Sequence, residues 1–120
     1  MSTRVAEIYR RILEAAESIG PFREEPKKTS IHLVTKSAFA GVATRKDAIV
    51  LTIKSASDIA STRIVKREQT SANRWHLEIR LDDPKQVDRE LTSWLADAMR
   101  LSASSPARPA SSTVPRPTRR

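Results

Sequence analysis

The sequence contains no cysteine, which excludes disulfide bonds, thiolate chemistry and zinc sites built on cysteine ligands. Glycine occurs twice, at Gly20 and Gly41, so a glycine-rich loop that cradles phosphate is also excluded. No serine lies in a G-x-S-x-G turn, the nucleophile motif of many hydrolases. We therefore predict that the chain is not an enzyme and that it binds no cofactor.

Long apolar runs are also absent. The longest uncharged and mostly apolar stretch covers residues 37–44, far fewer than a membrane-spanning helix requires. The first sixteen residues include three arginines and two glutamates, so they lack the apolar segment of a secretory signal. The absence of cysteine fits a reducing compartment. We expect a cytoplasmic protein with no membrane partner.

Negative charge is scarce, because 22 lysines and arginines stand against 14 carboxylates and give a net charge of +8. Residues 101–120 hold four of the arginines and no carboxylate, so half of the excess charge lies there. This stretch is also rich in serine and proline, a composition that cannot bury enough apolar surface to offset the entropy of ordering. We predict one domain over residues 1–101 and a disordered basic tail over residues 102–120.

Apolar residues at helical spacing predict one helix at each end of the domain. The first helix spans residues 3–19 and ends before a Gly-Pro pair. The second helix begins with a capping pattern at Asp83, ends near Leu101, and is expected to bury Trp94. The apolar stripe of the first helix consists of Val5, Ile8, Ile12, Ala15 and Ile19.

Five segments between the helices have strand patterns. Residues 48–54 are apolar on both faces, which predicts a central strand, whereas the charged residues 62–68 suit a sheet edge. Residues 74–81 alternate most clearly and direct Trp75 to the core. The polar residues 21–28 are expected to be a connector. The five predicted strands cover residues 29–36, 37–44, 48–54, 62–68 and 74–81.

The predicted element order, α-β-β-β-β-β-α, indicates an α+β fold. Two amphipathic terminal helices need one sheet face to cover, which gives a two-layer sandwich with both helices on the same face. A parallel sheet would need more crossover helices than the chain has, so we predict a mainly antiparallel sheet.

Short motifs along the folded part carry a resemblance to a known family. They are I-G-P at 19–21, P-K-K-T at 26–29, F-A-G-V at 39–42, W-H-L at 75–77, D-R-E-L at 88–91 and W-L at 94–95. In these motifs the segment from Ile8 to Met99 resembles a bacterial family called domain of unknown function 5655. Members of that family are small stand-alone proteins or appendages to other domains, some of them nuclease-like. The resemblance implies an accessory module and implies no catalytic activity.

The two histidines, His32 and His76, are expected on the solvent-facing side of the sheet. They suggest either a general base or anion-sensing pair, or two ordinary exposed strand residues. A metal ion needs three or four convergent ligands. The histidines and Glu78 barely reach that number, and the neighbouring Arg74 and Arg80 oppose a bound cation. We therefore predict no metal site.

Lysine and arginine gather in the predicted strands and turns, which suggests either a surface that follows phosphates or an ordinary solvated face. Exposed rings for base stacking are not expected there. The candidate contacts for an anion or a nucleic acid are Lys28, Lys46, Arg74, His76 and Arg80. The cations of this region include Lys27, Lys28, Arg45, Lys46, Lys54, Arg63, Lys66, Arg67, Arg74 and Arg80, against Asp47, Asp58, Glu68 and Glu78.

Three functions stay open from the sequence. The first is a non-catalytic accessory or interaction module, including one that self-associates through an exposed sheet edge or face. The second is weak, sequence-independent nucleic-acid binding through the basic sheet face and tail, and an enzyme with a hidden site ranks last. An apolar patch on the open sheet face would favour the first, a basic groove the second, and a deep pocket at either histidine the third.

Overall fold

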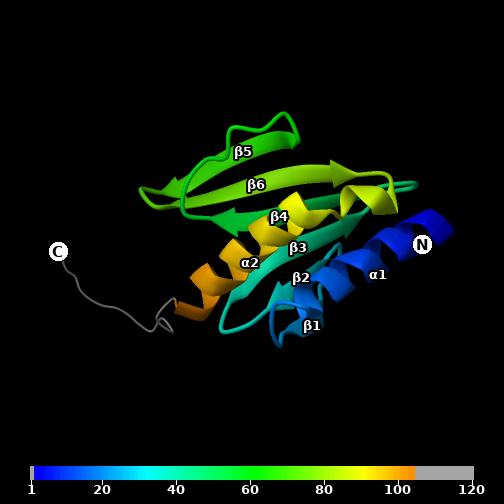
Figure 1. Cartoon of the computed structure of the whole chain (residues 1–120), viewed down its shortest axis with the longest axis horizontal. Coiled ribbons are helices and arrows are strands. Elements are labelled where there is room, and N and C mark those ends of the chain that lie inside the picture. The colour runs from blue at the N-terminus through cyan, green and yellow to red at the C-terminus, as the bar shows by residue number, and fades with distance from the viewer. Residues whose placement is uncertain (1, 105–120) are drawn as a thin grey trace.

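The computed structural model describes residues 2–104, and within them it confirms an α+β sandwich. Helix α1 (Thr3–Glu17) comes first, six strands follow, and helix α2 (Arg89–Ser104) closes the domain. The strands form one antiparallel sheet in the order β1-β2-β3-β4-β6-β5, and both helices lie on one side of it (Figure 1). The strands are β1 (Arg23–Pro26), β2 (Ile31–Val34), β3 (Ala38–Thr44), β4 (Ile49–Ser55), β5 (Ile64–Ser71) and β6 (Arg74–Leu81).

The sheet has one strand more than the sequence predicted. Strand β1 lies within residues 21–28, which were expected to be a connector, and it pairs with β2 along its whole length. Its side chains are mostly exposed, so it has no apolar alternation that a sequence pattern could reveal. Tyr9 of α1 donates a hydrogen bond of 2.5 Å to the Glu24 carboxylate and joins this edge strand to the helix layer.

The predicted places of two strands are confirmed. Strand β4 lies inside the sheet between β3 and β6, and the charged β5 forms an edge. On the side of the helices, Ile49, Leu51 and Ile53 of β4 are buried. On the other side Val50 is half-buried, so the expected burial on both faces is complete only beneath the helices.

The core lies between the helices and the sheet. Helix α1 buries Val5, Ile8 and Ile12 as predicted and also Ala16, whereas Ala15 and Ile19 are half-buried and pack against the core. Ser2 caps the helix, because its hydroxyl accepts a hydrogen bond of 3.1 Å from a backbone N–H of the first turn. From α2 and the sheet the core receives Leu91, Leu95, Ala98, Leu33, Val42, Leu51, Leu77, Ile79 and Leu81.

The capping pattern at Asp83 is present, but it opens a short 3₁₀ helix, η1 (Pro84–Gln86), instead of α2. The chain leaves the helical path after η1, and α2 begins with a second cap. The carboxylate of Asp88 accepts a hydrogen bond of 3.0 Å from the N–H of Leu91. The sequence pattern therefore identified a real helix start and missed the break that follows it.

Helix α2 continues to Ser104, whereas the sequence analysis ended it near Leu101. Ser102 is buried, and its hydroxyl donates a hydrogen bond of 3.2 Å to the carbonyl of Ala38 on β3. The last turn of the helix is thus fixed to the sheet. Residues 105–120, most of the predicted tail, lie outside the described residues.

Both tryptophans are half-buried and pack against the core, whereas the sequence analysis predicted that they belong to it. Trp75 is the second residue of β6 and lies opposite Ser55, the last residue of β4. Trp94 lies on α2 with the guanidinium carbon of Arg63 5.6 Å from its ring centroid. Strand alternation and helix spacing correctly predicted that each ring faces the core, but they overestimated how deeply each ring is buried.

We expect Trp75→Ala to lower the free energy of unfolding by about 1–2 kcal/mol, because part of the ring is already in water. A fully buried tryptophan would cost about 3–5 kcal/mol. Urea unfolding followed by circular dichroism measures the difference. A loss above about 3 kcal/mol would mean that the ring is a core residue after all.

Candidate functional site

The open face is the side of the sheet opposite the helices. Strand register aligns His32, Gly41, Thr52 and Glu78 in one row across β2, β3, β4 and β6. In the next row Lys54 of β4 lies opposite His76 of β6. Partners in a ladder project to the same side. Both histidines therefore lie on the open face, as predicted.

The open face is hollowed over its middle strands. The hollow has a volume of about 510 Å³, which is the size of a small-molecule site. The small residues Gly41 and Ala43 lie on its central strand β3, and His32 and His76 line it from β2 and β6. These two strands are three inter-strand steps apart, or roughly 14 Å. Among residues 2–104, no carboxylate lines the hollow.

Lys54 is the half-buried cation of this hollow. Its ammonium donates a hydrogen bond of 3.3 Å to the hydroxyl of Ser37. Burial, and after it the positive charge of Arg74, lower the pKa of Lys54 below its ordinary value. Both causes disfavour the charged ammonium. An anion bound beside Lys54 would stabilise this charged form.

Charge is divided between the two layers of the domain. Residues 18–81, which form the sheet and its turns, contain twelve lysines and arginines and six carboxylates. The helical parts, residues 3–17 and 82–104, contain six and eight. The sheet layer therefore carries the positive charge and the helix layer is slightly acidic. Within the part of the chain that the structure describes, no ion pair is made by Arg45, Lys54, Lys66 or Arg74.

The predicted anion contacts do not all meet. Arg74, His76 and Arg80 occupy alternate positions of β6 and share the open face. Lys28 lies in the turn between β1 and β2, and Lys46 lies in the turn between β3 and β4, both exposed. Of the five, His76 lines the hollow. Four of the five predicted residues therefore lie outside the lining of the hollow.

The sequence analysis missed three residues of the hollow as site candidates. Arg45 and Lys54 were counted among the basic residues without a role, and Gly41 was noted only as one of the two glycines and as part of a family motif. Alternation along β4 could place Lys54 on the open face. Its position opposite His76 depends on the register between β4 and β6, and this register cannot be read from the sequence.

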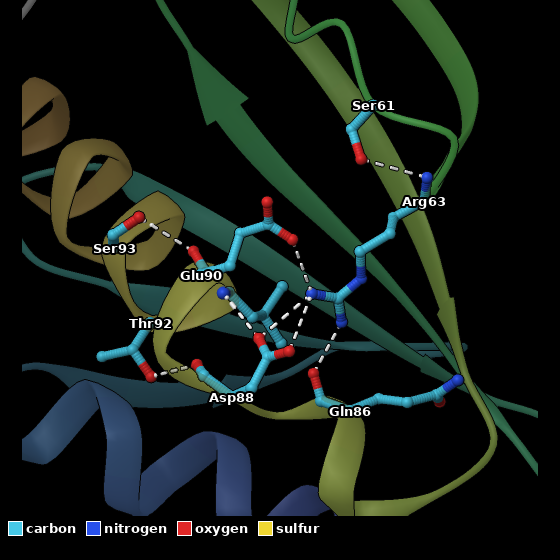
Figure 2. A network of polar contacts seen from close by, with 8 residues as sticks. Ser61, Arg63, Gln86, Asp88, Glu90, Thr92 and Ser93 are labelled. Carbon is cyan, nitrogen blue, oxygen red and sulfur yellow. Dashed lines mark hydrogen bonds and ion pairs between the residues drawn. The ribbon is translucent and has the colours of Figure 1, made fainter.

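Arg63 was grouped with the basic residues of the sheet, but its guanidinium is turned toward the helix layer (Figure 2). It donates hydrogen bonds of 3.0 Å and 3.1 Å to the carboxylates of Asp88 and Glu90. It also donates one of 2.6 Å to the carbonyl of Gln86. The side chain is 23% exposed and lies over the ring of Trp94. Arg63 therefore connects the start of β5 to the start of α2 and is not free to bind a partner.

We expect Asp88→Asn to remove an acid-sensitive part of the stability, about 1 kcal/mol after allowance for solvent screening. The hydrogen bond from Leu91, and then Arg63, hold the pKa of Asp88 below its ordinary value. A carboxyl with a lowered pKa stabilises the fold above its unfolded pKa of about 3.9, and this stabilisation is lost as the pH falls through the folded pKa. Asparagine is also a good N-cap, so the variant mainly loses the charge.

Urea unfolding of the protein and of Asp88→Asn between about pH 2 and 7 measures this difference. The two curves should be separated at pH 6, should begin to converge as the pH falls below about 4, and should meet once the pH is below the folded pKa of Asp88. A difference that stays constant down to pH 2 would contradict the assignment.

The described residues contain no cluster of three histidines or carboxylates that could hold a metal ion. Among the same residues, neither helix is long and apolar enough to cross a membrane. The site on the open face is thus built from cations, hydroxyls and small residues.

Comparison with known proteins agrees with the resemblance seen in the sequence motifs. No curated protein and no solved structure matches this chain. A family model described as "Domain of unknown function (DUF5655)" matches residues 2–102, which include α1, the whole sheet and nearly all of α2. The chain therefore belongs to the DUF5655 family.

Proposed function

We propose that this domain is a non-catalytic binding module that holds nucleic acid on the open face of its sheet through contacts to phosphate groups. The observation that carries the proposal is that four cations of the sheet layer make no ion pair with a described residue, and that no carboxylate of residues 2–104 lines the hollow. Phosphate oxygens are the natural partners of such cations. The slightly acidic helix layer would face away from the polymer.

A surface for a protein partner is less well supported. Large exposed apolar side chains mark such surfaces, and in the described part of the chain Val65 is the one that is mostly exposed, at 61%. Both sheet edges also oppose strand addition. Strand β1 is four residues long and ends in Pro26, and the charged β5 is interrupted by two register shifts.

A catalytic role for the histidines is also less well supported, although both line the hollow. A general base needs a partner that fixes its tautomer and orientation. Within residues 2–104, neither the ring of His32 nor the ring of His76 has a hydrogen bond to a carboxylate or a carbonyl, and no nucleophile is paired with either ring. We therefore assign them to binding.

The proposed contacts predict a particular kind of recognition. Phosphate contacts carry no base information, so affinity should not depend on the sequence of the polymer. Among the described strands, the Phe, Tyr and Trp rings are Phe39 and Trp75, the first buried and the second half-buried, so base stacking should add little. The four arginines of residues 101–120 would add charge to the same contact.

The test is fluorescence anisotropy of a labelled duplex with the full chain between about 50 and 200 mM salt, where phosphate contacts weaken steeply. We expect binding at the lower salt concentration. The triple variant Arg45→Gln, Lys46→Gln, Lys66→Gln should reduce the slope of log affinity against log salt by nearly three, one for each lost contact. All three side chains are exposed.

A matched control removes the same charge from the helix layer. The variant Arg11→Gln, Lys85→Gln, Arg89→Gln also replaces three exposed cations, and none of the three makes an ion pair with a described residue. It should change the slope by less than about one. Equal losses in the two variants would show that net charge alone drives binding. Absence of binding at about 50 mM salt would end the proposal.

A further inference from the structure

We infer that the hollow on the open face is a discrete site for one phosphate monoester attached to a flat ring, as in a nucleoside monophosphate. The inference rests on the proposed function only in placing phosphate on this face. It adds a bound group of defined size to what would otherwise be a diffuse basic surface.

The size of the hollow supports a compact ligand. Its volume of about 510 Å³ and its span of roughly 14 Å from β2 to β6 fit one nucleotide with room for water. A polymer that follows a surface through scattered charges needs no such depression. The hollow is therefore an additional feature that the proposed function does not require.

The lining of the hollow is divided by chemistry. Small residues, Gly41 and Ala43, occupy the central strand and leave the backbone open to a flat ring. At the β4–β6 side, Lys54 and His76 lie opposite each other in the ladder and supply donors for a phosphate. Thr52, two residues before Lys54 on the same face, offers a hydroxyl between the two parts.

The charge of the hollow favours a group with two negative charges. Lys54 is half-buried, and within residues 2–104 the sole hydrogen bond of its ammonium goes to the Ser37 hydroxyl. A dianionic monoester would offset the charge of Lys54 in the hollow and that of Arg74 outside it on the same face, whereas a backbone diester carries one charge for each phosphate. This difference separates a terminal or free phosphate from the interior of a strand.

Gly41 provides a test that leaves every charge in place. A Cβ added there would meet only the His32 ring, at an ordinary contact distance of 3.7 Å, so the strand accepts a side chain. In Gly41→Ala the hollow is nearly unchanged. In Gly41→Val two further methyl groups would enter it, and a β-branched residue suits a strand.

The experiment is isothermal titration calorimetry of the full chain with adenosine 5′-monophosphate, adenosine and inorganic phosphate. We expect the monophosphate to bind at least about tenfold more tightly than either fragment, because it uses both parts of the hollow. Gly41→Ala should retain binding within about threefold, and Gly41→Val should weaken it by about tenfold or more. Lys54→Met should weaken the monophosphate by a similar factor and leave adenosine unchanged.

Two further arms separate the possible outcomes. A short strand with a 5′-phosphate should compete with the monophosphate, and the same strand with a 5′-hydroxyl should not; competition by neither would assign the site to free nucleotides. Duplex binding by Gly41→Val should keep the salt slope of the unmodified protein. If duplex still binds but the monophosphate does not, the inference fails and the proposed function stands. If the monophosphate binds equally well to Gly41→Val, the hollow is not its site.

Discussion

Replacing Leu51 by alanine is expected to lower the free energy of unfolding by about 3–4 kcal/mol, the largest loss that we predict for a single site. Leu51 is fully buried on β4, between Val42 of β3 and Ile79 of β6, beneath the helices. Truncation leaves a cavity that the surrounding strands cannot close, because their backbone positions are fixed by the ladder. Thermal unfolding should shift down by roughly 15 °C for a domain of this size.

The control for this variant lies one residue away. Val50→Ala changes the open face of the same strand, where the side chain is half-buried, and should cost about 1 kcal/mol or less. Urea titration of both variants gives the comparison. Similar losses for the two would contradict a core that lies on the helix side of the sheet.

Replacing Arg63 by alanine is expected to cost about 2–3 kcal/mol, which is unusual for an arginine on a small domain. The change leaves the carbonyl of Gln86 without its donor and removes the cation shared by Asp88 and Glu90. It also uncovers the ring of Trp94. The loss is limited because the two carboxylates are about half exposed and can be hydrated.

Arg80→Ala serves as the control for Arg63→Ala. Arg80 and Asp82 form an ion pair of 3.7 Å with both side chains more than half exposed, and such pairs contribute less than about 1 kcal/mol. Urea unfolding at neutral pH measures both variants. Equal stability of the two would show that the contacts of Arg63 add nothing beyond an exposed pair. Arg63→Lys should recover part of the loss, since it restores the charge but not the planar fork.

The fold could be predicted from the sequence wherever burial leaves a periodic pattern. Strand β6 and helix α1 each bury one face. Apolar residues therefore alternate along β6 and recur at helical spacing along α1. Strand β1 buries almost nothing and is held by its ladder with β2, so nothing in residues 21–28 distinguishes it from a loop. The break between η1 and α2 was missed because the capping pattern at Asp83 is equally compatible with one continuous helix.

The candidate site was harder to predict than the fold, because it depends on register. Alternation placed His32 and His76 on the same face, but only the pairing of β4 with β6 brings Lys54 opposite His76. Counting charges likewise could not separate Arg63, which is committed to the helix layer, from Lys66, which has no ion pair in the described chain. Charge composition indicates a basic layer, and geometry decides which of its members are available.

The most direct test of the account is to locate the bound polymer on the domain. Amide chemical shifts of the ¹⁵N-labelled full chain, recorded during titration with a short duplex at about 50 mM salt, report which residues meet it. We predict that the perturbed amides cluster on β3, β4 and β6 around Gly41, Thr52 and His76, and that those of α1 remain unchanged. Perturbations confined to the helix layer, or spread evenly over both layers, would contradict the assignment of the open face as the binding surface.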